Sequence, residues 1–203
     1  MHTGTRSIGL LLLITALLGA LLAGCASPPP LPTSADREAR LWTGRFAARF
    51  PDPQSATGQG QANGRFRIEN LPGGTILLEL SSPLGQLIAR ARVAPDRAEL
   101  EDARGDIHRA ASDEQLTETL FGWPIPVRAL PRWLNGRIDR ANDADAPIQP
   151  QSTSDPADRS RDWRVRRSGG MPDRPRMLEL NFPGVEPDAS RRINLRLVIE
   201  SAR

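Results

Sequence analysis

Apolar and polar residues alternate along several short segments of the chain, which predicts β-strands with one buried face. Within residues 41–50, Trp42 and Phe46 share one face and arginines occupy the other. Within residues 87–93, the same alternation puts Leu87 and Ala89 on the same face of the predicted strand. The segment 75–80 is a continuous apolar run, which predicts a strand more buried than its neighbours. Further strands are predicted over 65–69, 98–101, 163–165, 177–182 and 192–200. Short strands separated by turns indicate an antiparallel sheet or barrel.

The middle of the chain changes to a helical period. Ser112 and Gln115 have the spacing of a capping box, and an apolar stripe that includes Leu116 and Leu120 follows. A second short helix is predicted over 127–134. Both helices are too short to be stable alone, so we expect them to lie on the sheet. We also expect a short helix over 36–40 and a long loop over 139–161, which is poor in apolar residues.

The first 24 residues are predicted to be a signal peptide, so we do not expect them to be part of the folded domain. Residues 8–22 form an apolar run that is short for a membrane span and typical of a secretory signal. Leu-Ala-Gly then precedes Cys25, and this resembles the lipobox of bacterial lipoproteins, in which the cysteine becomes the lipidated first residue. Ala26 follows it, which by the same resemblance implies the outer membrane. The alternative is an ordinary secretory signal with a chance cysteine.

The predicted organisation is therefore a cleaved signal peptide over 1–24, a lipidated and proline-rich tether over 25–40, and one domain over 41–203. Proline is frequent directly after Cys25, so we expect an extended tether. By the same resemblance, we expect the lipid-anchored domain to face the periplasm.

The composition leaves little equipment for catalysis. The 203 residues contain no lysine and no tyrosine, so all 27 basic residues are arginine. Without lysine there is no Walker A loop and no Schiff-base residue. One cysteine and two histidines do not provide a disulfide or a typical zinc site. We therefore expect no enzymatic activity, no cofactor and no metal. A pair of glycosidase carboxylates could come from any part of the chain, so that class stays open.

His108 and the arginines have structural interpretations. His108 lies in an alternating stretch and is expected on a strand face. The net formal charge is only +3, so nucleic-acid binding is disfavoured. The arginines that alternate with apolar residues are interpreted as the solvated face of a sheet. Contact with anionic head groups or an acidic partner is the alternative.

Residues 82–85 read Ser-Pro-Leu-Gly between two predicted strands. Serine at the first position, Pro83 at the second and Gly85 at the fourth fit a type I turn. Leu84 then occupies the third position, at the tip of a hairpin. A leucine at this position is not buried in the core and so does not stabilise the fold by burial. In a membrane-tethered protein it can enter lipid, whereas the plain alternative is an ordinary exposed leucine.

Four motifs occur in a characteristic order: Trp-Thr-Gly-Arg-Phe-Ala at 42–47, the turn at 82–85, Pro-Ile-Pro at 124–126, and Leu-Pro-Arg-Trp-Leu-Asn-Gly at 130–136. With the lipobox, this order resembles the LolB family of outer-membrane lipoprotein receptors. The resemblance implies an unclosed antiparallel β-barrel whose mouth is covered by a lid of short helices over an apolar cavity. Arg167 departs from the family pattern, in which an aromatic residue is usual.

The resemblance also implies a function. Members of the family accept lipoproteins from the soluble carrier LolA and insert them into the outer membrane, with the acyl chains held between barrel and lid. The absence of a nucleotide motif predicts passive transfer. The alternative that this chain is itself a LolA-like carrier is disfavoured, because a soluble carrier has no lipobox. The rival hypothesis is a structural or assembly lipoprotein that binds a partner through its surface and holds no lipid.

The resemblance assigns two candidate sites. The membrane-insertion loop falls on Pro83, Leu84 and Gly85. The candidates for the lining of the acyl-chain cavity are the following apolar residues of the predicted strands and helices: Phe46, Phe66, Leu78, Leu80, Leu116, Leu120, Trp123, Leu130 and Trp133. The expected partners are a LolA-like carrier, the acyl chains of cargo lipoproteins and outer-membrane lipids, and we expect a monomer.

Overall fold

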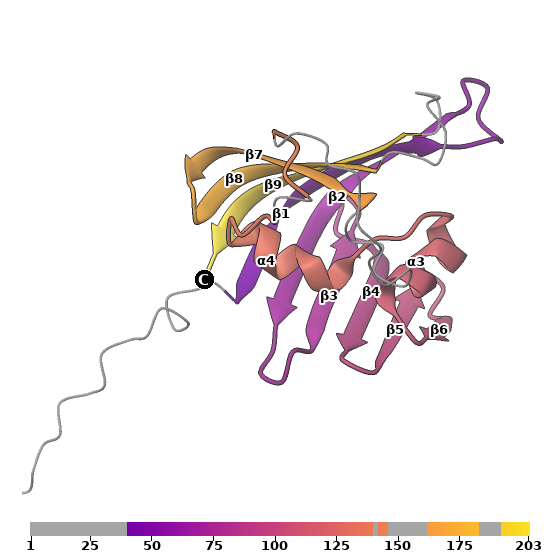
Figure 1. The fold of residues 1–203 in the computed structure, drawn as a ribbon. Coiled ribbons are helices and arrows are strands. Elements are labelled where there is room, and N and C mark those ends of the chain that lie inside the picture. The colour runs from indigo at the N-terminus through magenta and orange to yellow at the C-terminus, as the bar shows by residue number, and fades with distance from the viewer. Residues whose placement is uncertain (1–39, 140–141, 146–161, 183–191) are drawn as a thin grey trace, which may run out of the picture. The chain divides into compact units, whose positions relative to one another are not determined.

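The computed structural model describes residues 40–139, 142–145, 162–182 and 192–203. These residues form strands, a helical segment and further strands, which confirms the predicted order (Figure 1). The elements are β1 (Leu41–Pro51), β2 (Gln59–Asn70), β3 (Ile76–Ser81), β4 (Leu87–Ala94), β5 (Arg97–Asp102), β6 (Ile107–Ala110), α3 (Asp113–Phe121), the 3₁₀ turn η1 (Val127–Ala129), α4 (Leu130–Leu134), β7 (Arg164–Met171), β8 (Arg174–Phe182) and β9 (Ile193–Ala202).

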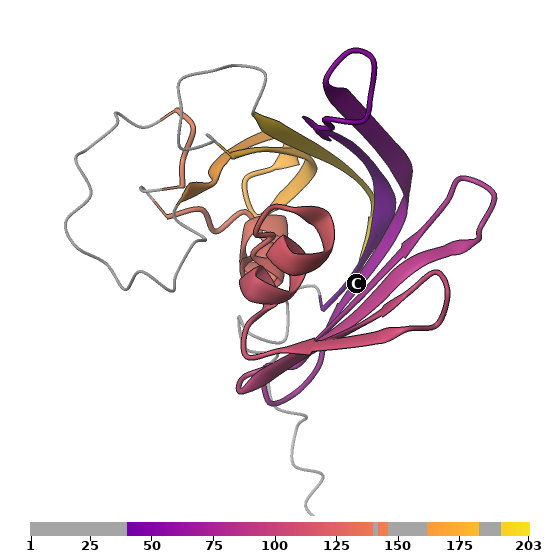
Figure 2. The same ribbon diagram turned by 90° about the vertical axis from the view of Figure 1, so that its right-hand side faces the viewer.

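The strands form one antiparallel sheet in the order β6-β5-β4-β3-β2-β1-β9-β8-β7. β9 pairs with β1, so the three C-terminal strands extend the sheet formed by the first six. In the described part of the chain, β6 and β7 are the two edges and do not pair, so the barrel is not closed. The sheet curves around the helical segment (Figure 2). This confirms the expected unclosed antiparallel barrel with short helices at its open face.

Alternation along the strands separates a buried inner face from a charged outer face. On β1, Trp42 and Phe46 are buried whereas Arg45 is exposed, as predicted. Arginines of the outer face pair with acids on adjacent strands. The Nη2–Oε2 distance of Arg90 and Glu79 is 3.0 Å, and further pairs of this kind link β5 to β6 and β8 to β9. Such exposed pairs contribute little stability each. They support the interpretation of these arginines as a solvated sheet face.

Two details of the predicted strands are wrong. β3 is not more buried than its neighbours, because only Ile76 is fully buried and Leu78 and Leu80 are half-buried. These two leucines lie at the margin of the packed core and line a pocket beside it. In β4, the register shifts beside Leu80, and Leu87 pairs with Ser81, which lies on the opposite face from Leu80. A β-bulge of this kind inserts one extra residue and changes which side chain faces inward.

The helical segment is held by local caps and buried polar contacts. The Ser112 hydroxyl accepts a hydrogen bond from the Gln115 amide, so the predicted N-cap is confirmed. The Thr117 hydroxyl accepts from the Ile125 amide at 2.7 Å. The buried Trp163 indole donates to the Pro124 carbonyl at 3.0 Å. These contacts fix the segment between α3 and η1 to both the helix and the β7 side of the sheet.

Several predictions fall outside the described residues. They are the signal peptide, the lipidated Cys25 and its tether, the helix over 36–40 apart from the non-helical Arg40, and most of the loop over 139–161. In the described part of that loop, Asp143 makes a single parallel bridge with Val165. No helix in the described residues has the length and hydropathy needed to cross a membrane.

Candidate functional site: an apolar pocket and an exposed hairpin tip

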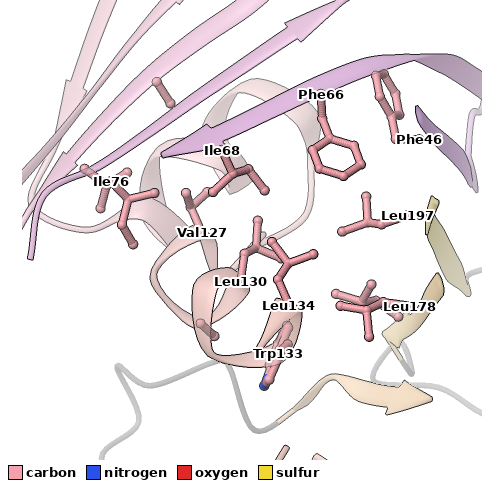
Figure 3. Packing of buried hydrophobic residues seen from close by; sticks show 14 of the residues in the cluster. Phe46, Phe66, Ile68, Ile76, Val127, Leu130, Trp133, Leu134, Leu178 and Leu197 are labelled. Carbon is pink, nitrogen blue, oxygen red and sulfur yellow. The ribbon is translucent and has the colours of Figure 1, made fainter. Parts of the chain in front are cut away.

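An apolar pocket lies between the inner face of the sheet and the helical segment. Its volume is about 170 Å³. Every residue on its wall is apolar, and β1, β2, β3, β4 and β9 provide the sheet side. The lining residues are Phe46, Ala48, Phe50, Ala62, Phe66, Ile68, Leu78, Leu80, Ile88, Phe121, Trp123, Ile125, Leu130, Ile193, Leu195 and Leu197. Figure 3 shows Phe66 and Ile68 pointing from β2 toward Leu130 of α4.

The size and chemistry of the pocket suit part of an acyl chain. Apolar cavities of about 150 Å³ stay dry and hold a benzene-sized molecule. Pockets for larger ligands are usually about 300–1,000 Å³. The volume of about 170 Å³ lies below this range, so in this conformation the pocket holds only part of an acyl chain.

Six of the nine residues predicted to line a cavity lie on this wall: Phe46, Phe66, Leu78, Leu80, Trp123 and Leu130. They come from β1, β2, β3, the segment after α3, and α4, and the fold brings them together. The structure does not place Leu116, Leu120 and Trp133 on the pocket. α3 packs against β5 and β6 and contributes its last residue, Phe121, to the pocket wall, whereas Leu116 is buried away from the wall. Trp133 is fully buried on α4, which packs against β8 and β2.

Sequence reasoning missed other residues on the wall. Phe50, Ile193, Leu195 and Leu197 lie on strand faces that alternation predicts to be inward, so that signal was present in the sequence. Ile88 carried no such signal, because the β-bulge beside Leu80 brings it to the wall.

The β3–β4 hairpin has the predicted turn. The Gly85 amide donates to the Ser82 carbonyl at 2.9 Å, and the Ser82 amide donates to the Gln86 carbonyl at 2.7 Å. Gly85 has φ of +86°, whereas Pro83 and Leu84 have negative φ, so the turn is of the type I class followed by a left-handed glycine. Leu84 is 90% exposed at the tip.

A buried carboxylate joins the two parts of the helical segment. Asp113, at the start of α3, is 1% exposed and accepts a hydrogen bond from the Arg128 amide at 2.8 Å. The Arg128 Nε lies 3.4 Å from the other carboxylate oxygen, and Arg128 also donates to the Ala94 carbonyl at the end of β4. Burial, followed by the neighbouring Asp113 carboxylate, raises the pKa of Glu114 to about 7.

His108 lies on β6 opposite Leu100, as expected for a strand-face residue. Its Nε2 is 3.5 Å from an Asp102 carboxylate oxygen. The backbone amide of Arg104 is the main cause that lowers the pKa of Asp102. The described residues contain no cluster of three or more histidine, cysteine or acidic side chains that could hold a metal ion.

Comparison with known proteins gives one consistent family. The family model described as "Outer membrane lipoprotein LolB" matches residues 42–201. A relative from Bordetella petrii named "Outer-membrane lipoprotein LolB" is 34% identical over 189 residues, which cover 92% of this chain and 90% of the relative. Relatives with the same name from Bordetella pertussis and Ralstonia nicotianae are 33% and 30% identical, over 90% and 97% of this chain and 88% and 97% of their own lengths. The chain belongs to the LolB family of outer membrane lipoproteins.

Proposed function

We propose that the protein accepts lipoproteins from a LolA-like periplasmic carrier and inserts them into the outer membrane by passive transfer of their acyl chains. The wholly apolar pocket between the sheet and the helical segment carries this proposal. A pocket lined by apolar and aromatic residues, with no charged side chain on its wall, selects a ligand mainly by burial, and acyl chains are ligands of that kind.

Burial also supplies the direction of transfer. Each buried methylene contributes about 0.8 kcal/mol, so an acyl chain moves toward the site that buries more of it. The pocket of about 170 Å³ holds only part of a chain until the helical segment moves, whereas a bilayer buries all of it. The chain lacks the lysine of a Walker A loop, which agrees with transfer that consumes no nucleotide.

Leu84, with Pro83 and Gly85 shaping its turn, is proposed as the contact with outer-membrane lipid. Burying a leucine side chain contributes about 1.5–3 kcal/mol. That is enough for reversible contact with a bilayer and too little to anchor a domain. The anchor is proposed to be lipid on Cys25, which lies outside the described residues, and the domain over 41–203 is proposed to act as a monomer that faces the periplasm.

The test is transfer of a labelled lipoprotein from the carrier to the full-length protein in proteoliposomes without nucleotide. We expect the label to move to the protein and then to the bilayer. If no label moves, the proposal is wrong. A displacement assay with a hydrophobic fluorescent probe separates it from the rival hypothesis of an assembly lipoprotein, which predicts that no probe binds.

A further inference from the structure

The pocket opens at one end of the strands. On β1 the lining residues change from the buried Phe46 to the half-exposed Phe50, toward the β1–β2 turn. On β2 they change in the same direction, from the buried Phe66 to the half-exposed Ala62. The other end is closed by fully buried side chains, among them Ile68. Because the sheet is antiparallel, the open end is also the end from which the β3–β4 hairpin projects.

Two aromatic rings meet across this open end. The ring centroids of Phe50 on β1 and Trp123 on the segment after α3 are 4.7 Å apart, with an interplanar angle of 34°. Both rings line the pocket and both are half-exposed. Phe121 lies beside Trp123 at 6.2 Å. This contact joins the sheet to the helical segment at the exposed end of the pocket.

A glycine sets the position of the Phe50 ring. Gly60 is the cross-strand partner of Phe50. A Cβ at Gly60 would lie 2.4 Å from Cε2 and 2.8 Å from Cζ of the Phe50 ring, so the ring lies directly over the glycine. The three atoms nearest to that Cβ all belong to this one ring, so the closest clash is with the ring.

The backbone that follows Trp123 is held by hydrogen bonds. The residue that follows it, Pro124, accepts the hydrogen bond from the buried Trp163 indole, and the Ile125 amide is bound by the Thr117 hydroxyl. Displacement of the Phe50 or Trp123 ring, or separation of the helical segment from the sheet, would therefore widen this end.

We propose that Phe50 and Trp123 form a gate through which acyl chains enter and leave the pocket, and that Gly60 sets how far the gate is closed. This inference rests on the proposed function. It places the path of the acyl chain at the end of the sheet that carries Leu84, so a chain that leaves the pocket emerges beside the proposed membrane contact.

The test measures uptake and release of pyrene-labelled hexadecanoic acid by the full-length protein in lipid nanodiscs. Energy transfer from tryptophan to pyrene reports the bound probe, and only the part that excess unlabelled hexadecanoic acid removes is counted. The variants are Gly60→Ala, Phe50→Leu, the double variant, and Phe46→Leu as a matched control deep in the same pocket. Thermal unfolding shows that each variant is folded.

Changing a gate alters the rates of probe uptake and probe release in the same direction, so the affinity for the probe stays nearly unchanged. In Gly60→Ala the added Cβ forces the Phe50 ring off its preferred rotamer and destabilises the closed gate, so uptake and release should both accelerate by about two- to tenfold. Phe50→Leu should also accelerate both. Leucine lacks the Cε2 and Cζ atoms that the Cβ would contact, so Gly60→Ala should add little further acceleration in the double variant. Phe46→Leu should change the affinity without this parallel change of rates.

Two results separate the failure of the gate from the failure of the proposed function. If the probe binds and both Phe50→Leu and Gly60→Ala keep the wild-type rates, the gate is wrong and the pocket proposal stands. If Gly60→Ala does not fold, unchanged rates in Phe50→Leu alone are sufficient to reject the gate. If the wild-type protein shows no competable signal, the proposed function fails and the gate fails with it.

Discussion

Replacement of Leu84 by glutamate separates a membrane role from a structural role. The side chain is 90% exposed at the third position of a type I turn, so Leu84→Glu should change the free energy of unfolding by less than about 0.5 kcal/mol. Membrane contact through this leucine is worth about 1.5–3 kcal/mol. Its loss should slow delivery of cargo to a bilayer by about 10- to 100-fold, since 1.4 kcal/mol corresponds to a factor of ten.

The assay uses the full-length protein in proteoliposomes and a lipoprotein with a fluorescent acyl chain, and it measures capture and delivery separately. Capture should stay at the wild-type rate in Leu84→Glu, because Leu84 does not line the pocket. Met171→Glu is the matched control. Met171 is also an exposed apolar residue of a hairpin, but the β7–β8 turn lies at the opposite end of the strands. Normal delivery by Leu84→Glu, or an equal loss in Met171→Glu, would refute the assignment.

Three further variants test the scaffold around the pocket. Gly64→Ala places a Cβ 2.0 Å from the Ser81 carbonyl oxygen, so urea unfolding should show a loss of at least about 1–3 kcal/mol; wild-type stability would contradict the β2–β3 register. Asp113→Ala removes the buried acceptor of the Arg128 amide and should cost about 1–3 kcal/mol by the same measurement, with partial recovery in Asp113→Asn. The raised pKa of Glu114, about 7 against 4.5 in the unfolded chain, means that the folded state binds more protons, so stability should fall as the pH rises from about 4.5 to about 7. Glu114→Gln should flatten that fall in urea titrations across this range, and an unchanged pH profile would count against the raised pKa of the half-buried Glu114 carboxyl group.

Local sequence patterns were sufficient to predict most of the fold. Alternation located β1 and β9 because each has one face toward the core and one toward water. The Ser112 cap and the turn at Leu84 were predictable because each depends on residues within four positions of one another. β3 was misjudged for a physical reason. A leucine that faces an open pocket and a leucine in a packed core give the same apolar pattern.

The pocket was less predictable because its wall is assembled by long-range packing. Leu116 and Trp133 have the same apolar character as Leu130, but the placement of α3 and α4 on the sheet decides which of them meets the pocket. Ile88 reaches the wall only because the register shifts beside Leu80. Neither the helix placement nor the bulge leaves a periodic signal in the sequence.

A pocket of about 170 Å³ that has to widen to hold a complete acyl chain suits the proposed passive relay better than a large open cavity would. Separating the helical segment from the sheet exposes apolar surface of Phe66 and Leu130, and that cost is subtracted from the free energy of holding an acyl chain. On this proposal the protein holds its ligand less tightly than the same buried area would allow, whereas a fluid bilayer imposes no such cost. The proposed release of cargo to a membrane depends on this difference in free energy. Mutations that keep the pocket open, without changing its wall, should therefore strengthen capture and slow delivery.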